Sequence, residues 1–299
     1  MTDVVVAGAI NTDLVARLPR APDAGETVTG NEFNIYGGGK GANQALGSAR
    51  SGVATAILGA VGADEFGRQR LADMNADGID TSAVLVRQDT ASGVALIIVE
   101  RETGQNRISY VPGATLTITP TEAAEAVHRL GPQYLLTTLE LPSDSIGATI
   151  DSARRAGATV LLNATPEPEG AARFLESIDV LIVNEVEATS LLGNVPVDWM
   201  SAAESLRELG PAWVIITLGA LGAVATFAGE QASAPVPSVT VTDSTGAGDA
   251  LCGAFVAALA SGLGPEDALR RGVAAGSAAC TVDGAQRSMP TRATIESLL

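Results

Sequence analysis

The sequence predicts an α/β protein with a mostly parallel central sheet flanked by helices. Short, continuously apolar runs recur along the 299 residues, and most of them are separated by longer stretches with a helical pattern. Continuous apolarity is typical of parallel strands that are covered on both faces, and the alternation is typical of right-handed βαβ units. No linker divides the chain, so we expect a single domain over residues 1–299.

The expected elements follow in chain order. The first strand, Val4–Ala9, leads into the polar segment Asn11-Thr12-Asp13. Similar apolar runs predict further strands at Thr55–Leu58, Tyr134–Thr138, Thr159–Leu162, Val180–Val183 and Val214–Thr217. Helices are expected at Ser143–Ala156 and Ser201–Leu209. The spacing of Thr119 and Glu122 predicts a capping box at a helix start, and Ser201–Glu204 repeats that spacing.

Two segments interrupt the alternation of strands and helices. Residues 14–36 contain prolines and glycines but no helical pattern, and residues 82–111 contain the strand-like runs Val94–Val99 and Ile108–Val111. We expect these two segments to form a small β-sheet above the carboxyl edge of the main sheet, where ligands bind in open α/β folds. Such a sheet is typical of a lid.

Composition and charge exclude several classes of function. The 34 acidic and 18 basic residues give a formal charge of −16, which disfavours binding to nucleic acid or to an anionic membrane surface. The single histidine, His128, excludes a multi-histidine metal site. Cys252 and Cys280 lack the spacing of a metal or redox pair, so we expect reduced thiols in a cytoplasmic protein. The uncharged stretch from Ala250 to Pro265 is too short to span a bilayer and predicts a buried helix.

A glycine-rich motif, DSTGAGD, occupies residues 243–249 immediately before that uncharged helix. Gly246, Ala247 and Gly248 are small enough for their backbone amides to approach an anion, and the N-terminus of the helix adds partial positive charge. Asp249 would repel a phosphate, so its plausible use is to accept a proton from an attacking hydroxyl. The alternative is a glycine-rich turn in which Asp249 only stabilises the start of the helix.

A second glycine-rich motif, YGGGKGANQ, occupies residues 36–44. It is not a P-loop, because Lys40 is followed by glycine instead of serine or threonine, and it does not match a dinucleotide fingerprint. Asn43 supplies an amide that can both donate to and accept from a hydroxyl, and Asn11 and Asp13 are similar short polar residues. Several such side chains at one sheet edge indicate a polyhydroxylated ligand such as a sugar.

With these two motifs in order and about 200 residues apart, the chain resembles the PfkB-type carbohydrate kinase family over essentially its whole length. Gly38–Gln44 matches the first motif of the family, and Asp243–Asp249 matches the second, D-[ST]-x-G-A-G-D. Residues 8–13 and 22–27 are similar to those of the family members that act on D-ribose. The resemblance implies the α/β fold and lid of that family and ATP-dependent phosphorylation of a sugar.

The resemblance also implies roles for individual residues. Asp249 would be the catalytic base, and the amides of Gly246, Ala247 and Gly248 would form the anion hole. The sugar would be held by Asn11, Asp13, Gly38, Gly39, Lys40, Asn43, Glu140 and Asp249. The nucleotide would contact Asn184, Glu187, Thr217, Leu218, Gly219, Ala220, Leu221, Gly222 and Gly248.

Two metal ions are implied by the same resemblance. Mg²⁺ would accompany ATP, with Glu187 acting on it through water. A monovalent activator, K⁺, would be held by Asp243, Thr245, Ala279, Val282, Gly284 and Ser288, mostly through main-chain carbonyls, which suit a large hard cation. The chain differs from the usual pattern of the family at Val273, near the expected adenine pocket, and at Thr115.

The resulting expectation is transfer of phosphate from ATP to the primary hydroxyl of D-ribose, giving D-ribose 5-phosphate and ADP. One alternative keeps the chemistry with another small sugar, such as a ketohexose or deoxyribose, or a nucleoside. Only ten residues are aromatic (2 Trp, 3 Tyr and 5 Phe), which leaves little to stack a nucleobase. A non-catalytic sugar-binding module is an alternative of another class, but such a module needs neither Asp249 nor Glu187.

The strand Val94–Val99 is apolar on both faces, and only one face can cover the sugar. No helix nearby in the sequence is available to cover the other face. The family resemblance implies that the lid of a second subunit covers it, so we expect a homodimer with a self-complementary interface.

Overall fold

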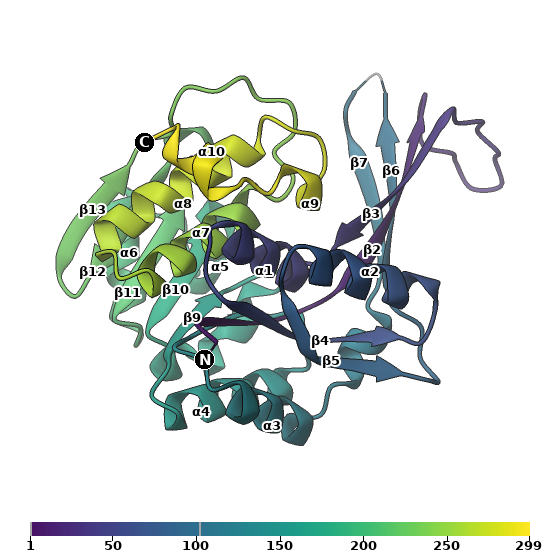
Figure 1. Cartoon of the computed structure of the whole chain (residues 1–299). Helices are drawn as coiled ribbons and strands as arrows, with labels where there is room; N and C mark the ends of the chain where they lie inside the picture. Colours follow the sequence, from purple (N-terminus) through teal and green to yellow (C-terminus); the bar gives the residue numbers. More distant parts are fainter. Residues whose placement is uncertain (1, 102) are drawn as a thin grey trace.

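The structure is a computed structural model that describes residues 2–101 and 103–299. Its centre is a large sheet with the strand order β13-β12-β11-β10-β9-β8-β1-β4-β5 (Figure 1). The strands from β11 to β5 are mutually parallel, and β12 and β13 form an antiparallel hairpin at one edge. The strands are β1 (Val4–Ala7), β4 (Thr55–Gly62), β5 (Asp80–Arg87), β8 (Tyr134–Thr138), β9 (Thr159–Asn163), β10 (Val180–Asn184), β11 (Trp213–Thr217), β12 (Ala223–Phe227) and β13 (Glu230–Ala234).

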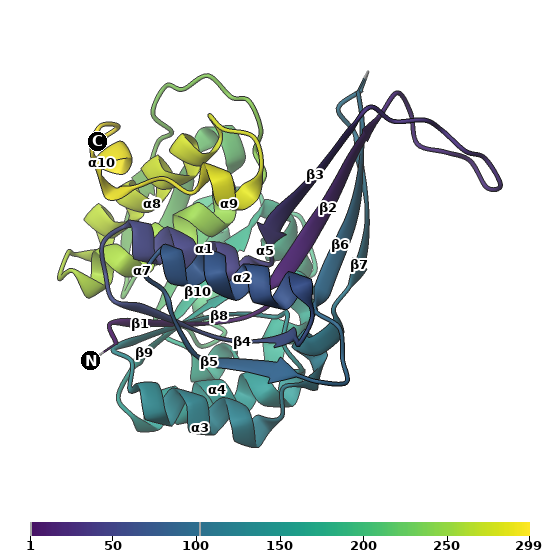
Figure 2. The same cartoon turned by 45° about the vertical axis from the view of Figure 1, so that its right-hand side comes forward.

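Helices cover both faces of this sheet, as the continuously apolar strands require (Figure 2). One apolar core packs α1, α2, α7 and α8 on one face, and a second core packs α3, α4, α5 and α6 on the other. The helices are α1 (Lys40–Arg50), α2 (Glu65–Ala76), α3 (Pro120–Leu130), α4 (Ser143–Arg155), α5 (Glu185–Leu192), α6 (Trp199–Arg207), α7 (Ala247–Ala260), α8 (Pro265–Ala279), α9 (Ala285–Ser288) and α10 (Arg292–Glu296). The expected α/β architecture is confirmed.

Helix α7 contains most of the uncharged stretch that the sequence predicts to be a buried helix, but it begins at Ala247, includes Asp249 in its first turn and ends at Ala260; it packs against α1 and α8. Its contact with α1 is unusually close at Gly253. A Cβ atom at this position would lie 2.6 Å from the main-chain oxygen of Gln44 and 2.7 Å from the nitrogen of Ser48. The two glycine-rich motifs run into the first turns of α1 and α7, so this contact holds the motifs at a fixed separation.

A second, four-stranded sheet has the order β3-β2-β6-β7 and stands beside the body of the molecule (Figure 2). It is built from β2 (Asn11–Leu18), β3 (Glu32–Gly38), β6 (Gly93–Glu100) and β7 (Asn106–Val111). Strands β2 and β6 are parallel, whereas the outer pairs are antiparallel. The expected small sheet therefore exists, but residues 82–87 were wrongly included in it. They belong to β5, which pairs with β4 at the edge of the large sheet.

The ends of two helices test the capping predictions. Thr119 and Glu122 form the expected capping box at the start of α3. The predicted start of α6 at Ser201 is wrong, because α6 begins at Trp199 and the cap is Asp198, whose carboxylate accepts a hydrogen bond from the Ser201 amide.

None of the helices in the described part of the chain combines the length and apolarity of a membrane span. Cys252 and Cys280 are free thiols.

Candidate active site at the carboxyl edge of the sheet

The segment after β1 and the start of α1 meet at one carboxylate, that of Glu140. Its Oε2 atom accepts hydrogen bonds from the amides of Ala9 (2.9 Å) and Gly41 (3.0 Å), and Oε1 accepts from the amide of Lys40 (3.0 Å). Burial raises the pKa of Glu140, while these backbone hydrogen bonds lower it. The carboxylate therefore anchors the first glycine-rich motif, a structural role that the sequence analysis missed.

The glycines of that motif are required by close contacts within the protein. Gly39 has a φ of 89°, and a Cβ atom there would lie 2.4 Å from the carbonyl oxygen of Ala9. A Cβ atom at Gly38 would lie 2.3 Å from Oδ1 of Asp13. Gly38 therefore lies directly against the Asp13 carboxylate, and only a glycine leaves room for it.

Seven of the eight expected sugar-binding residues line one cavity of about 800 Å³, and Gly38 is not among its wall residues. Side chains of the small sheet complete the wall. The expected residues on the wall are Asn11, Asp13, Gly39, Lys40, Asn43, Glu140 and Asp249. The contributions of β6 and β7 are Ala95, Ile97, Ile108 and Tyr110, of which the sequence analysis singled out none as a site residue.

Asp249 is a buried carboxylate of this cavity and is held by two side-chain amides. It is 7% exposed, and its Oδ2 atom accepts a hydrogen bond from Nδ2 of Asn43 at 2.9 Å. Its Oδ1 atom accepts from Nε2 of Gln44, also at 2.9 Å. Burial raises the pKa of Asp249, and the charge of Lys40 and the two amides oppose that rise. The two motifs, about 200 residues apart in the sequence, thus meet through direct hydrogen bonds.

Lys40 lies among carboxylates. Burial disfavours its charge, but Asp249, Glu140 and Glu187 outweigh burial and raise the pKa of Lys40. The ammonium group is therefore charged at neutral pH. Among the described residues that line the 800 Å³ cavity, Lys40 is the only lysine or arginine.

Two buried acceptors of residues that line the 800 Å³ cavity lack partners among the described residues. They are Oδ1 of Asn11 and Oδ1 of Asn43, and both side chains are 5% exposed. Buried polar atoms without a partner are rare because they cost free energy. Both residues belong to the cavity wall, so these acceptors could be satisfied by a hydroxylated ligand once it binds there.

A smaller cavity, of about 120 Å³, adjoins the first one at Lys40, Gly246 and Asp249. Its remaining wall includes Asn184 and Glu187. These two residues form a capping box at the start of α5: Oδ1 of Asn184 accepts from the amide of Glu187, and Oε2 of Glu187 accepts from the amide of Asn184, both at 2.8 Å. Burial raises the pKa of Glu187. The motif therefore stabilises the helix and also presents a carboxylate to the cavity.

The N-terminus of α7 borders this small cavity. Gly246 caps the helix with a φ of 80°, and a Cβ atom there would lie 2.9 Å from Cε of Met289. The amide of Ala247 donates to the carbonyl of Ser244 (3.2 Å), and the space beside Gly248 is open. Gly246 and Gly248 thus lie where first-turn amides and the helix dipole favour an anion.

A third cavity, of about 570 Å³, shares Thr217 and Gly248 with the small one. Four of the nine expected nucleotide-binding residues do not line it: Asn184 and Glu187 line the small cavity instead, Leu218 is buried and Leu221 is 75% exposed. The expected residues on its wall are Thr217, Gly219, Ala220, Gly222 and Gly248, together with Ala247 and Val273. Other wall residues belong to no motif, and the sequence analysis did not assign them to the site: Val236, Pro237, Ser238, Val239, Val241, Ser277 and Cys280.

The residues expected to hold a monovalent cation lie on two adjoining loops joined by Asp243. Its Oδ2 atom accepts from the amide of Gly284 (2.9 Å), and Oδ1 accepts from the amide (2.9 Å) and hydroxyl (2.7 Å) of Thr245. Burial opposes ionisation of Asp243, but these hydrogen bonds lower its pKa. With the Asp243 carboxylate, the expected set comprises the main-chain carbonyls of Ala279, the last residue of α8, of Val282 and Gly284 in the turn that follows, and of Ser288, the last residue of α9. This donor set fits a large hard cation.

No three His, Cys, Asp or Glu side chains gather into a metal-binding cluster within residues 2–101 and 103–299.

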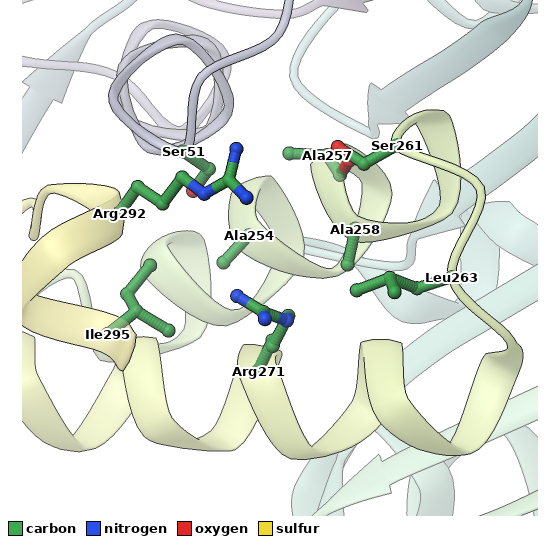
Figure 3. A pocket seen from close by; sticks show the side chains of 9 residues that line it. All are labelled: Ser51, Ala254, Ala257, Ala258, Ser261, Leu263, Arg271, Arg292 and Ile295. Atoms are coloured by element: carbon green, nitrogen blue, oxygen red, sulfur yellow. The ribbon is translucent and has the colours of Figure 1, made fainter. Parts of the chain in front are cut away.

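A further cavity, of about 120 Å³, lies away from the site between α1, α7, α8 and α10 (Figure 3). Arg271 and Arg292 point into it, but both lie near Glu296, at 3.6 and 2.9 Å. The two arginines thus have a partner within the protein.

Comparisons with known proteins agree with this geometry. A family model described as pfkB family carbohydrate kinase matches residues 1–292. Ribokinase from Bacillus subtilis is 34% identical over 300 residues, covering 100% of both chains, and ribokinase from Mus musculus is 36% identical over 303 residues, covering 96% of this chain and 91% of the mouse chain. A structure of Arabidopsis thaliana ribokinase complexed with ribose and ATP superposes with a TM-score of 0.91 at 30% identity, covering 100% of this chain and 99% of that one.

Proposed function

The chain belongs to the pfkB family of carbohydrate kinases, and we propose that it transfers the γ-phosphoryl group of ATP to the primary hydroxyl, O5, of D-ribose. The products are D-ribose 5-phosphate and ADP. The observation that carries this proposal is the series of three adjoining cavities, with Asp249 and Lys40 at the junction between the first two. A sugar, a phosphate chain and a nucleoside fit this order.

The sugar occupies the 800 Å³ cavity between the small sheet and the carboxyl edge of the large sheet. Its hydroxyls donate to the unpartnered Oδ1 atoms of Asn11 and Asn43 and to the carboxylate of Asp13. The primary hydroxyl points to Asp249, which removes its proton as the oxygen attacks phosphorus. The raised pKa of Asp249 makes the carboxylate a stronger base than an exposed aspartate.

The transferring phosphoryl group is stabilised by charge and by amides. Lys40 and the first turn of α7 at Gly246 and Gly248 face the negative oxygens, and donors of this kind act on charge that develops in the transition state. Mg²⁺ bound with ATP supplies neutralisation of the phosphate charge. Glu187, on the wall of the small cavity, would orient the water shell of that ion.

Substrate choice is tested by measuring ADP release with a panel of ribose, 2-deoxyribose, a ketohexose and nucleosides. The expected result is the highest kcat/KM with ribose. A nucleoside as the best substrate would favour the alternative within the same chemistry. ADP release that no sugar stimulates would favour a binding module.

Two free cysteines suit the reducing cytoplasm, where we place the reaction.

The affinity for the sugar should depend on pH through Asp13. Burial raises its pKa to about 6, although Arg70 lowers it. The ionised carboxylate accepts hydrogen bonds from hydroxyls, so the KM for ribose should rise as pH falls through about 6. Because the pKa is raised in the folded state, the stability that this group contributes is lost as pH rises from 3.8 to about 6. Its titration therefore does not unfold the protein at low pH. A KM step that persists in Asp13→Asn would assign the titration to another group.

Potassium should activate the enzyme through the Asp243 loops. The loop at Ala285 packs on Gly246, where a Cβ atom would lie 3.0 Å from Cα of Ala285, so a bound cation would order the anion-binding turn. Replacing K⁺ with a bulky organic cation at constant ionic strength should lower kcat, and Asp243→Ala should abolish the difference between the two salts. Asp243→Asn keeps an oxygen that can accept hydrogen bonds from the loop amides but removes the negative charge. It therefore tests whether the charge is needed for cation binding when part of the loop structure is retained. Equal wild-type rates in both salts would contradict the site.

We further propose a homodimer formed by the outer face of the small sheet. Strand register places Phe33, Ile35, Leu96 and Val111 on the face opposite to the sugar cavity. They are 60%, 51%, 49% and 57% exposed, which is a large apolar patch for a free surface. The two-fold contact of this face with a second copy would cover it.

Leu96→Asp should therefore convert the dimer, near 60 kDa (twice 30.2 kDa), into a monomer in sedimentation experiments. Val197→Asp is the matched control, because Val197 is fully exposed in the loop before α6, far along the chain from the small sheet. A wild-type protein that sediments as a monomer at micromolar concentration, with and without ribose, would contradict the dimer.

A further inference from the structure

Gln44 is the side chain that connects the base to the buried part of the fold. It is completely buried in α1 and lies on none of the three cavity walls described above. Its Nε2 atom donates to Oδ1 of Asp249 at 2.9 Å and to Oδ1 of Asn163 at 3.0 Å. We propose that Gln44 is a positioning residue that fixes the orientation of the Asp249 carboxylate for proton transfer, and that Asn163 fixes the Gln44 amide in turn. This inference rests on the proposed function.

The hydrogen bonds determine which end of the Gln44 amide faces Asp249. Nδ2 of Asn163 donates to the carbonyl of Ile182 (3.1 Å), so Oδ1 of Asn163 faces Gln44. That atom and the ionised carboxylate of Asp249 can only accept, and both therefore require the NH₂ group of Gln44. Oε1 of Gln44 has no partner within the described residues. A buried unpaired acceptor is unfavourable, which indicates that the orientation is retained for the contact with Asp249.

The two amides on Asp249 differ in their surroundings. Asn43 lies on the wall of the sugar cavity, so its contacts change when a sugar binds. Gln44 lies behind the base, in the closest part of the contact between α1 and α7 at Gly253. One donor on each oxygen leaves a second lone pair on each for the attacking hydroxyl. Gln44 thus holds the plane of the Asp249 carboxylate in one orientation, whether or not a sugar is bound in the cavity.

The charges around Asp249 make this donor important for its ionisation. The titratable groups that face it are Lys40 on α1, Glu140 after β8, Glu187 on α5 and Cys252 on α7. Two of these groups are carboxyls and only one is a cation. Loss of the Gln44 donor therefore destabilises the ionised form of Asp249, so its pKa rises.

The test is Gln44→Met, which keeps the length of the side chain and removes the donor. We expect kcat to fall about 10- to 100-fold, because the base is no longer held in its reactive orientation. The KM for the sugar should change by less than about threefold, since Gln44 does not reach the sugar cavity. The acidic limb of the kcat profile should move up by about one pH unit, the size expected for one hydrogen bond to a charged group.

Ser48→Ala is the matched control. Ser48 lies one turn along α1, is also buried, and hydrogen-bonds to Thr55 without contacting Asp249. It should lower the melting temperature while leaving the pH profile at its wild-type position. A folded Gln44→Met variant with wild-type kcat and pH profile would overturn the proposal.

Gln44→Glu provides an independent test should the methionine variant fail to fold. The substituted acid can donate to Asp249 only while protonated, so kcat should decline as pH rises across the wild-type plateau. A profile that rises and levels off like that of wild type would contradict the positioning role. Wild type and Asp249→Asn are assayed in parallel. Wild-type ADP release that ribose does not stimulate would refute the proposed function itself, whereas a wild-type-like Gln44 variant beside an inactive Asp249→Asn would refute only the role of Gln44.

Discussion

Asp249→Asn is expected to lower kcat by about 10²–10⁴-fold or more while leaving sugar affinity within a few-fold of wild type. Among the described residues, Asp249 is the only carboxylate that lines both the 800 Å³ cavity and the small cavity of about 120 Å³, so the substitution removes the one proton acceptor at their junction. The measurement is kcat by ADP release, together with ribose binding by calorimetry. Retention of more than about a tenth of wild-type kcat would contradict the assignment of Asp249 as the base.

The fold should tolerate this substitution. The new amide would place one NH₂ group opposite Nδ2 of Asn43 or Nε2 of Gln44, both of which are donors. Oδ1 of Asn43 has no partner, so a flip of the Asn43 amide presents an acceptor instead. An unchanged melting temperature would show that the loss of activity is chemical. Asn43→Ala is a useful comparison, because it should raise the KM for ribose as well as lower kcat.

Glu140→Leu is expected to produce the largest loss of stability. It leaves the amides of Ala9, Lys40 and Gly41 buried without an acceptor. Each such group costs about 1–3 kcal/mol, and the sum is comparable with the stability of a typical domain, about 5–15 kcal/mol. Urea denaturation of the ligand-free protein should show a strongly lowered midpoint or no cooperative transition.

Two milder substitutions provide the controls for Glu140. Glu140→Gln retains one acceptor oxygen, so its loss of stability should be intermediate. Thr138→Val removes the hydroxyl that donates to Oε2 of Glu140 (3.0 Å) and keeps the carboxylate and all three amide contacts. Its effect should be the smallest of the three. A Glu140→Leu variant as stable as wild type would show that the anchor of the first glycine-rich motif is not needed for folding.

The sequence predicted the parallel sheet well because its strands are buried on both faces. The apolar runs at β1, β8, β9 and β10 carry that requirement directly, with every residue of β1 buried. The edge strand β5 is half exposed, and its pattern resembles that of the neighbouring antiparallel strands. Its place in the large sheet depends on pairing with β4, which is a long-range contact that periodicity does not encode.

The candidate site was predictable where a motif constrains the backbone. The resemblance pointed to Asn43 and Asp249 separately, and their hydrogen bond across 206 positions is consistent with both. Glu140 was expected to contact the sugar, and its three amide contacts became evident only when the loops before α1 were placed. The segment Val236–Val241 has no motif because it lines its cavity with short apolar residues that many loops contain.

The central claim is phosphoryl transfer to the primary hydroxyl of ribose, and the most direct measurement is the phosphorus-31 NMR spectrum of the product. Ribose, Mg·ATP and the enzyme should give ADP and a sugar phosphate in equal amounts. The phosphorus of that product should couple to the two protons of the C5 methylene group. Absence of ribose-dependent ADP, or a phosphorus coupled to a single ring proton, would contradict the claim.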